Sequence, residues 1–268
     1  MCGSSATAGW RSDMGAVRAG FLLQLRFYRH YPDLLVPLLT APLYGGIFAM
    51  IMSYNGRPDL AAAASLAPFY MSLWWFALFS GGWIIQTDRW EGTLEYVVSA
   101  PAGFASVVFG RVAATMLPGA AAFAETWLFA RYALHSDVTV RHWGAFLGSF
   151  ALTLFATAAT ALLMAAAFVL ARNAVTFSNS ASFPFYVLGG ILVPVALLPG
   201  WLQPLSKVVF LSWSADLLRA SIVADPVPHP VLGPVMVALL GIGALVAGTA
   251  VLRRILVQVR RTGELALR

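Results

Sequence analysis

The residue types best suited to chemistry lie in one short segment of a sequence that is otherwise poor in charge. Asp88, Arg89, Glu91 and Glu95 place four charges within eight residues, whereas only 10% of the 268 residues are charged. The same segment holds a tryptophan and a flexible Gly-Thr step, and Thr93 is placed to cap a short helix with Glu95 in its first turn. Such a mixture of acid, base and aromatic side chains indicates docking onto another protein.

A second candidate is Glu125, the one carboxylate inside a long apolar stretch. A carboxylate within a membrane costs at least a few kcal/mol unless it is paired or hydrated, so Glu125 is a candidate to line a transport path or to relay a proton. The alternative is that it lies near the outer end of its helix and pairs with Arg131 or snorkels there. An aromatic run in an earlier apolar stretch, residues 61–85, adds Tyr70 and Trp74 as candidates for a substrate path, with packing or lipid contact as the alternative.

Metal and nucleotide chemistry find little support in the sequence. The chain has one cysteine and four histidines, and none of them forms a His-x-x-x-His or Cys/His cluster, so we expect no metal site. A Walker A loop needs a lysine followed by serine or threonine, but the only lysine, Lys207, precedes a valine. We therefore expect no catalytic residue and no ATP hydrolysis on this chain.

The composition shows which medium must surround most of the chain. Hydrophobic residues make up 60% of the chain and the mean hydropathy is +0.78, which leaves too few polar groups to coat a surface that faces water. This excludes disorder and argues against an ordinary soluble domain, so the solvent for most of the chain should be lipid. We interpret the net charge of +6 as a mark of membrane topology and not of nucleic acid binding.

Six stretches are long and apolar enough to cross a bilayer as helices, and none alternates with the period of a barrel strand. We predict an all-α integral membrane protein with a single transmembrane domain over residues 1–268. Its six spans are predicted at 34–54, 61–85, 112–130, 143–171, 177–198 and 231–252. With both termini in the cytoplasm, twelve basic residues lie inside and five outside, which fits the positive-inside rule.

Two further segments are expected to lie along the membrane. Residues 14–31 place Arg18, Arg26 and Arg29 on one helical face and aromatic side chains on the other, which predicts an interfacial helix. The alternative is a simple basic flank of the first span. Residues 199–230 are too polar for a span and too apolar for a turn, so they predict an outer re-entrant cap, with a surface loop as the alternative.

Residues 89–95, 99–101 and 109–111 read RWEGTLE, SAP and FGR. This pattern resembles the signature of the permease subunits of type-2 bacterial ABC exporters, and the likeness extends over nearly the whole chain. The resemblance implies an interfacial helix, six spans, a cytoplasmic coupling helix between spans two and three, and re-entrant helices between spans five and six. It also implies that residues 87–98 are the coupling segment, with the coupling residues Arg89, Glu91, Gly92, Thr93 and Glu95.

By the same resemblance, the chain is the transmembrane half of an exporter in the bacterial plasma membrane. It would pair with a second permease, identical or paralogous, and with two cytoplasmic ATP-binding subunits that hold ATP and Mg. Closure of those subunits would drive alternating access for an amphipathic small molecule or a lipid.

Two other functions compete with this one. A lipid-modifying membrane enzyme would use Glu125 or the outer group His135, Asp137 and His142, but it needs several polar groups at one depth, where the sequence shows one. An ATP-independent carrier often has two related halves, and we find no repeat between residues 1–134 and 135–268.

Overall fold

The computed structural model describes residues 4–31, 36–54, 66–99, 103–132, 140, 142–171, 174–192, 194–222 and 231–262. All regular structure in these ranges is helical. His135 and Asp137 lie outside the described residues, as does the start of the second predicted span, and the side chain of Glu95 is not described either.

The elements follow in chain order. They are α1 (Ser4–His30), α2 (Val36–Tyr54), α4 (Leu66–Trp75), the π-helix η3 (Phe76–Gly81), α5 (Ile84–Trp90), α6 (Leu94–Ser99), α7 (Phe104–Tyr132), α8 (Trp143–Leu170), α9 (Ala174–Leu188), the 3-10 helix η4 (Val195–Leu197), α10 (Gln203–Ser206), α11 (Phe210–Ile222) and α12 (Leu232–Thr262).

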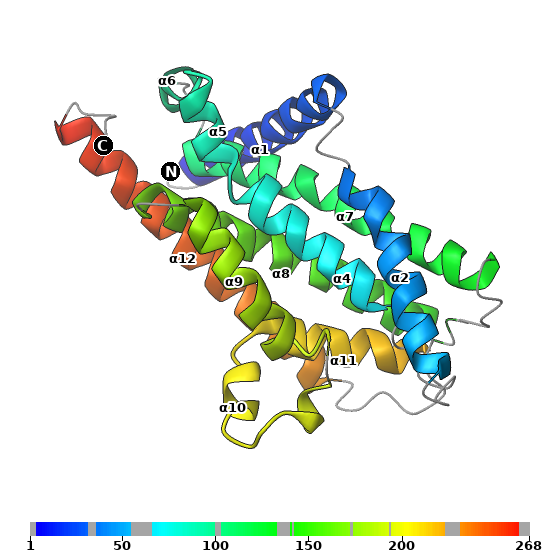
Figure 1. The fold of residues 1–268 in the computed structure, drawn as a ribbon. Coiled ribbons are helices and arrows are strands. Elements are labelled where there is room, and N and C mark those ends of the chain that lie inside the picture. Colours follow the sequence, from blue (N-terminus) through cyan, green and yellow to red (C-terminus); the bar gives the residue numbers. More distant parts are fainter. Residues whose placement is uncertain are drawn as a thin grey trace.

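The long helices form a bundle with α7 and α8 at its centre (Figure 1). Within the described residues, three stretches are long and apolar enough to cross a membrane: Phe104–Phe129, Trp143–Leu170 and Leu232–Gln258. Most of the apolar window of the first two is buried inside the protein, but only 22% of that of α12, so α12 leaves most of its surface to its surroundings. The all-helical membrane fold agrees with the prediction, whereas the arrangement of six spans stays a prediction.

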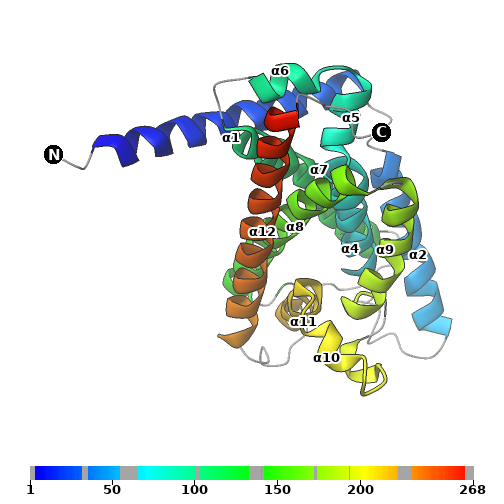
Figure 2. The same ribbon diagram turned by 90° about the vertical axis from the view of Figure 1, so that its left-hand side faces the viewer.

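The remaining elements lie at the two ends of this bundle. Figure 2 shows α1 crossing the end at which α5 and α6 lie, with its N-terminal part projecting beyond the other helices. The short helices α10 and α11 lie at the opposite end. The predicted interfacial and coupling segments therefore lie at one end of the molecule, and the predicted outer segment lies at the other.

The second predicted span, residues 61–85, is described from Leu66 onward, and this part is a broken helix. After α4, residues of η3 make π-type turns, and the Gly82 amide donates to the Ala77 carbonyl, five residues back, at 2.8 Å. A Cβ on Gly82 would lie 2.6 Å from the Phe168 ring of α8, so the glycine lets α8 approach the broken segment closely. Single π-turns of this kind are frequent at functional sites.

Other helices also depart from the predicted bounds. The helices α7 and α12 begin earlier or end later than the spans at 112–130 and 231–252, because a helix continues through arginines that end an apolar stretch. The fifth predicted span, 177–198, is α-helical only through Leu188. Gly190 follows with φ of +66°, and the Ile191 amide donates to the Tyr186 carbonyl, a helix-ending arrangement that requires glycine.

Candidate functional site

The predicted coupling segment is a helix, a tight turn and a second helix. Between α5 and α6, Gly92 has φ of +70°, a conformation that favours glycine, and the Thr93 amide donates to the Asp88 carbonyl at 2.8 Å. The Thr93 carbonyl accepts the first bonds of α6, but its hydroxyl donates back to the Asp88 carbonyl at 3.3 Å. Thr93 therefore closes the turn with its side chain, where the sequence predicted a side-chain cap of the next helix.

This turn presents its side chains outward. Trp90 and Tyr96 are 66% and 78% exposed, and Glu91 and Gly92 are exposed as well, while Arg89 is half-buried. Large exposed aromatics at the tip of a short helical hairpin are suited to burial against a partner. The exposed turn is thus a candidate docking surface.

Beneath the exposed turn, a buried ion pair joins α5 to α7. Arg111 Nη1 lies 2.5 Å from Asp88 Oδ2, and the two side chains are 4% and 5% exposed. Arg111 Nε also donates to Gln24 Oε1 of α1 at 3.1 Å. Removing one member of such a pair leaves an uncompensated buried charge, so Arg111 ties three helices together at one point.

The helices α1 and α7 touch backbone to backbone beside this ion pair. A Cβ on Gly110 would lie 2.0 Å from the Val17 carbonyl oxygen, and a Cβ on Gly20 would lie 2.1 Å from the Val107 carbonyl oxygen. Each glycine therefore accommodates the backbone of the other helix. This contact explains the FGR motif in physical terms, because Gly110 permits the approach and the next residue, Arg111, makes the ion pair.

Two more polar contacts extend the α1 attachment. Ser106 Oγ donates to Asp13 Oδ1 at 3.2 Å, and Tyr28 and Ser80 share a hydrogen bond of 2.7 Å between their hydroxyls. Burial raises the pKa of the Tyr28 phenol to about 12. The sequence predicted an aromatic face toward lipid on this helix, but Tyr28 points into the protein.

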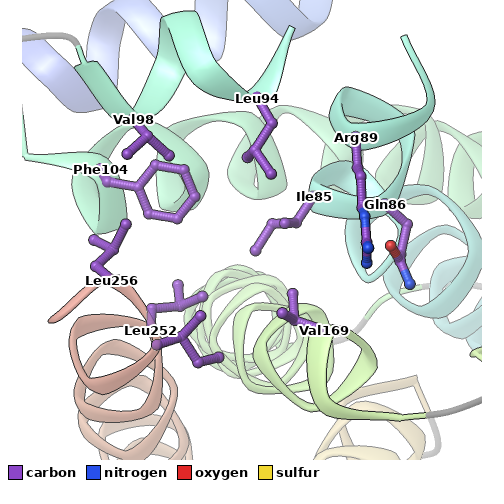
Figure 3. A pocket seen from close by; sticks show the side chains of 10 residues that line it. Ile85, Gln86, Arg89, Leu94, Val98, Phe104, Val169, Leu252 and Leu256 are labelled. Atoms are coloured by element: carbon purple, nitrogen blue, oxygen red, sulfur yellow. The ribbon is translucent and has the colours of Figure 1, made fainter. Parts of the chain in front are cut away.

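A small apolar cavity lies between the coupling segment and α12. It has a volume of about 50 Å³ and is lined from α5, α6, α7, α8 and α12. Figure 3 shows Leu94 and Val98 of α6 facing Leu252 and Leu256 of α12 across the gap, with the Arg89 side chain at its edge. The coupling helix is thus not tightly packed on this side.

A larger groove lies between α2, α4 and α9. It has a volume of about 350 Å³, within the range of small-molecule sites, and its lining includes Tyr44, Ser72, Trp75 and Tyr186. The Ser72 hydroxyl is buried and has no hydrogen-bond partner among the described residues. Among the described residues, no charged side chain lines the groove.

An aromatic row runs from this groove to the exposed turn. The ring centroids of Trp75 and Phe79 lie 5.5 Å apart in a stacked pair, those of Phe79 and Trp83 lie 6.4 Å apart, and those of Trp83 and Trp90 lie 5.4 Å apart. Trp83 Nε1 also donates to Ser178 Oγ of α9 at 3.1 Å. The row gives the turn and the groove a continuous packed connection along the second span.

The predicted substrate-path residues lie elsewhere. Tyr70 and Trp74 are both 1% exposed, and Tyr70 bonds through its hydroxyl to Ser214 of α11 at 2.7 Å. Neither lines the groove, which takes the next residue, Trp75. Glu125 is half-buried on α7, lines neither cavity, and its Oε2 has no hydrogen-bond partner among the described residues.

Sequence reasoning did not select Asp88, Arg111, Gln24 or Ser72 as site residues. Two signals were available, since Asp88 belongs to the charged segment 88–95 and Arg111 to the FGR motif. Among the described residues, no group of three or more His, Cys, Asp or Glu side chains could hold a metal ion.

Comparison with known proteins bears on all of these residues. Residues 17–223 match the model of a protein family described as ABC-2 type transporter. The matched region begins in α1 at the α1–α7 contact and includes the exposed turn, the ion pair and the groove. A search of curated proteins gave no match.

Proposed function

Because this chain belongs to the ABC-2 type transporter family, we propose that it is the permease of an exporter that moves an amphipathic small molecule or lipid out of the cytoplasm. The family consists of membrane subunits of ABC transporters, and the ATPase activity is carried by a separate partner. The family assignment thus decides against the lipid-modifying enzyme and the ATP-independent carrier.

The complete exporter contains two ATP-binding subunits, which hold ATP and Mg in the cytoplasm, and a second permease, identical or paralogous. It resides in the bacterial plasma membrane with both termini of this chain in the cytoplasm. The distribution of basic residues supports this orientation. In it, the exposed turn between α5 and α6 faces the ATP-binding subunits.

The observation that carries the proposal is an exposed turn held to the bundle by a buried ion pair. The coupling residues are Arg89, Glu91, Gly92, Thr93 and Glu95. Gly92 shapes the turn, and Glu91 lies on its exposed side. Since Asp88 at the base of the turn bonds to Arg111, displacement of the turn by the ATP-binding subunits moves α7 and α1 with it.

The substrate site of this exporter is the groove between α2, α4 and α9. Its Trp75 stands at the end of the aromatic row that begins at Trp90 in the exposed turn. Motion of the turn therefore changes the packing of a residue that lines the groove. Glu125 and the buried pair Tyr70 and Trp74 line no part of it.

The coupling proposal is tested with the double charge reversal E91K/E95K in the chain co-expressed with its ATP-binding subunit. Transport is expected to stop and the ATPase rate to lose its dependence on the permease, because the docking charges change sign. Membrane insertion is expected to stay normal, since Glu91 is exposed. The control is R254E, which reverses an exposed charge on α12. Transport by E91K/E95K at the wild-type rate would contradict the assignment.

A further inference from the structure

The chemistry of the groove between α2, α4 and α9 restricts what it can bind. Its lining residues contribute three aromatic rings, from Tyr44, Trp75 and Tyr186, one from each helix. The rest of the lining is aliphatic apart from two hydroxyls, those of Thr40 and Ser72. Since no described residue of the lining is cationic, an anionic group entering the groove would lose its hydration without gaining a positively charged partner.

The Trp75 ring is held in place before any ligand binds. It stacks on Phe79 with an angle of 25° between the ring planes and meets Phe76 edge-on at a centroid distance of 5.3 Å. An ordered ring needs little reorganisation to accept a flat ligand against its free face. Flat aromatic ligands stack on such rings, and a positive charge near them is attracted to the ring faces.

Ser72 supplies the polar contact. Its side chain is 6% exposed, lines the groove and has no hydrogen-bond partner among the described residues. Of the other three lining hydroxyls, that of Thr40 already donates to the Pro37 carbonyl at 2.9 Å. Tyr44 is exposed and Tyr186 is half-buried, and neither phenol oxygen is a buried atom without a partner. Because a buried hydroxyl without a partner is costly, Ser72 is the group in the lining best placed to bond a ligand.

We propose that the groove binds a planar aromatic amphiphile that is neutral or carries a positive charge, with one polar group hydrogen-bonded to Ser72. The inference rests on the proposed function, since it names the substrate class of the exporter. It excludes anionic substrates, such as phosphorylated lipids and acidic polysaccharides, from this groove.

The test measures direct binding to the purified full chain in lipid nanodiscs. Rhodamine 6G and fluorescein share a xanthene ring but carry opposite charges, and Nile red is a neutral planar dye. Specific binding is the rise in fluorescence anisotropy with nanodiscs that hold the chain, less the rise with protein-free nanodiscs at the same lipid concentration. We expect rhodamine 6G and Nile red to bind saturably, and fluorescein to bind at least about tenfold more weakly.

Variants locate the binding. S72A is expected to weaken rhodamine 6G binding about fivefold, and W75A about tenfold, while W75F keeps a ring and loses less. The matched control is S182A, a buried serine of α9 whose hydroxyl already donates to the Ser178 carbonyl and which does not line the groove. Elution of each variant as a single symmetric peak shows that it folds.

Fluorescein binding as tight as that of rhodamine 6G would overturn the charge restriction. Unchanged rhodamine 6G binding in both S72A and W75F, each folded, would place the site outside the groove. Neither result depends on the ATP-binding subunits. Wild-type transport by E91K/E95K would therefore contradict the coupling proposal without affecting the binding proposal. A negative result in the dye-binding experiment would likewise leave the coupling proposal unaffected.

Discussion

The predicted second span is a broken helix, and its two halves are held by different interactions. In the proposed orientation its cytoplasmic half is α5, which is fixed by charge, through the buried pair of Asp88 and Arg111. Its outer half, α4, is fixed by hydroxyls and rings, since Tyr70 bonds to Ser214 and the Trp74 ring lies 4.4 Å from that of Phe185. The π-helix η3 separates them.

The difference indicates which parts of the molecule move together. The cytoplasmic half is bonded to α7 and, through Arg111, to α1, whereas the outer half is bonded to α11 and packs on α7 and α9. Ser214 also bonds to Thr153 of α8 at 2.5 Å, which connects α4 and α11 to the centre of the bundle. We therefore expect the two halves to respond separately to substitution, and three changes test this in decreasing order of expected effect.

The largest effect is expected from R111M at the cytoplasmic end. The substitution leaves the Asp88 carboxylate buried without its partner, which costs about 3–5 kcal/mol of unfolding free energy. Thermal unfolding of the purified chain in detergent measures the loss. The double variant D88L/R111M removes both charges and is expected to regain most of the stability, yet to transport poorly, because the link from the turn to α7 is gone.

The outcome of the double variant separates two roles for the ion pair. If D88L/R111M transports at the wild-type rate, the pair serves stability alone and the turn is connected to the spans by other contacts, such as the aromatic row. If the double variant is as unstable as R111M, the cost lies in packing at Arg111 and not in the unpaired charge.

The sequence predicted these two regions to different extents. Apolar length alone predicted the helices, and the charges of residues 88–95 indicated the exposed turn. The partner of Asp88 could not be predicted, because Arg111 lies 23 residues away and neither its positive charge nor its place in the FGR motif indicates which carboxylate it meets. The sequence does not show the role of Gly110 either, because the need for a glycine there follows only from the crossing of α1 and α7 at that point.

The outer half shows a second limit of sequence reasoning. Trp74 and Trp75 are adjacent, so they point in directions about 100° apart, and nothing in the sequence says which one faces a cavity. The structure buries Trp74 and places Trp75 in the groove. The π-turns directly after Trp75 add a further shift to the helical phase, which a regular 3.6-residue period does not anticipate.

The second effect is expected from G110A, which tests the attachment of α1 to the cytoplasmic half. The new methyl group would lie 2.0 Å from the Val17 carbonyl oxygen, and backbone cannot move aside as a side chain can. We expect a loss of about 2–3 kcal/mol and faster proteolysis of α1. The matched control is G144A on α8, where a Cβ meets nothing within 4 Å. Equal stability of G110A and G144A would show that α1 can move away from α7 at little cost in free energy.

The smallest effect is expected from S214A at the outer end. The Tyr70 hydroxyl keeps Thr153 as a second hydrogen-bond partner, and Thr153 keeps its bond to the Ser149 carbonyl, so the substitution removes one of two partners of a buried hydroxyl and costs about 1 kcal/mol. The double variant Y70F/S214A removes the phenol hydroxyl as well and is expected to lose little further stability. Since this network lies on the far side of the π-helix from the exposed turn, S214A should leave the ATPase rate of the assembled transporter unchanged. A drop in that rate as large as the one caused by R111M would mean that the two halves of the second span move as one rigid helix, and the division at η3 would have to be abandoned.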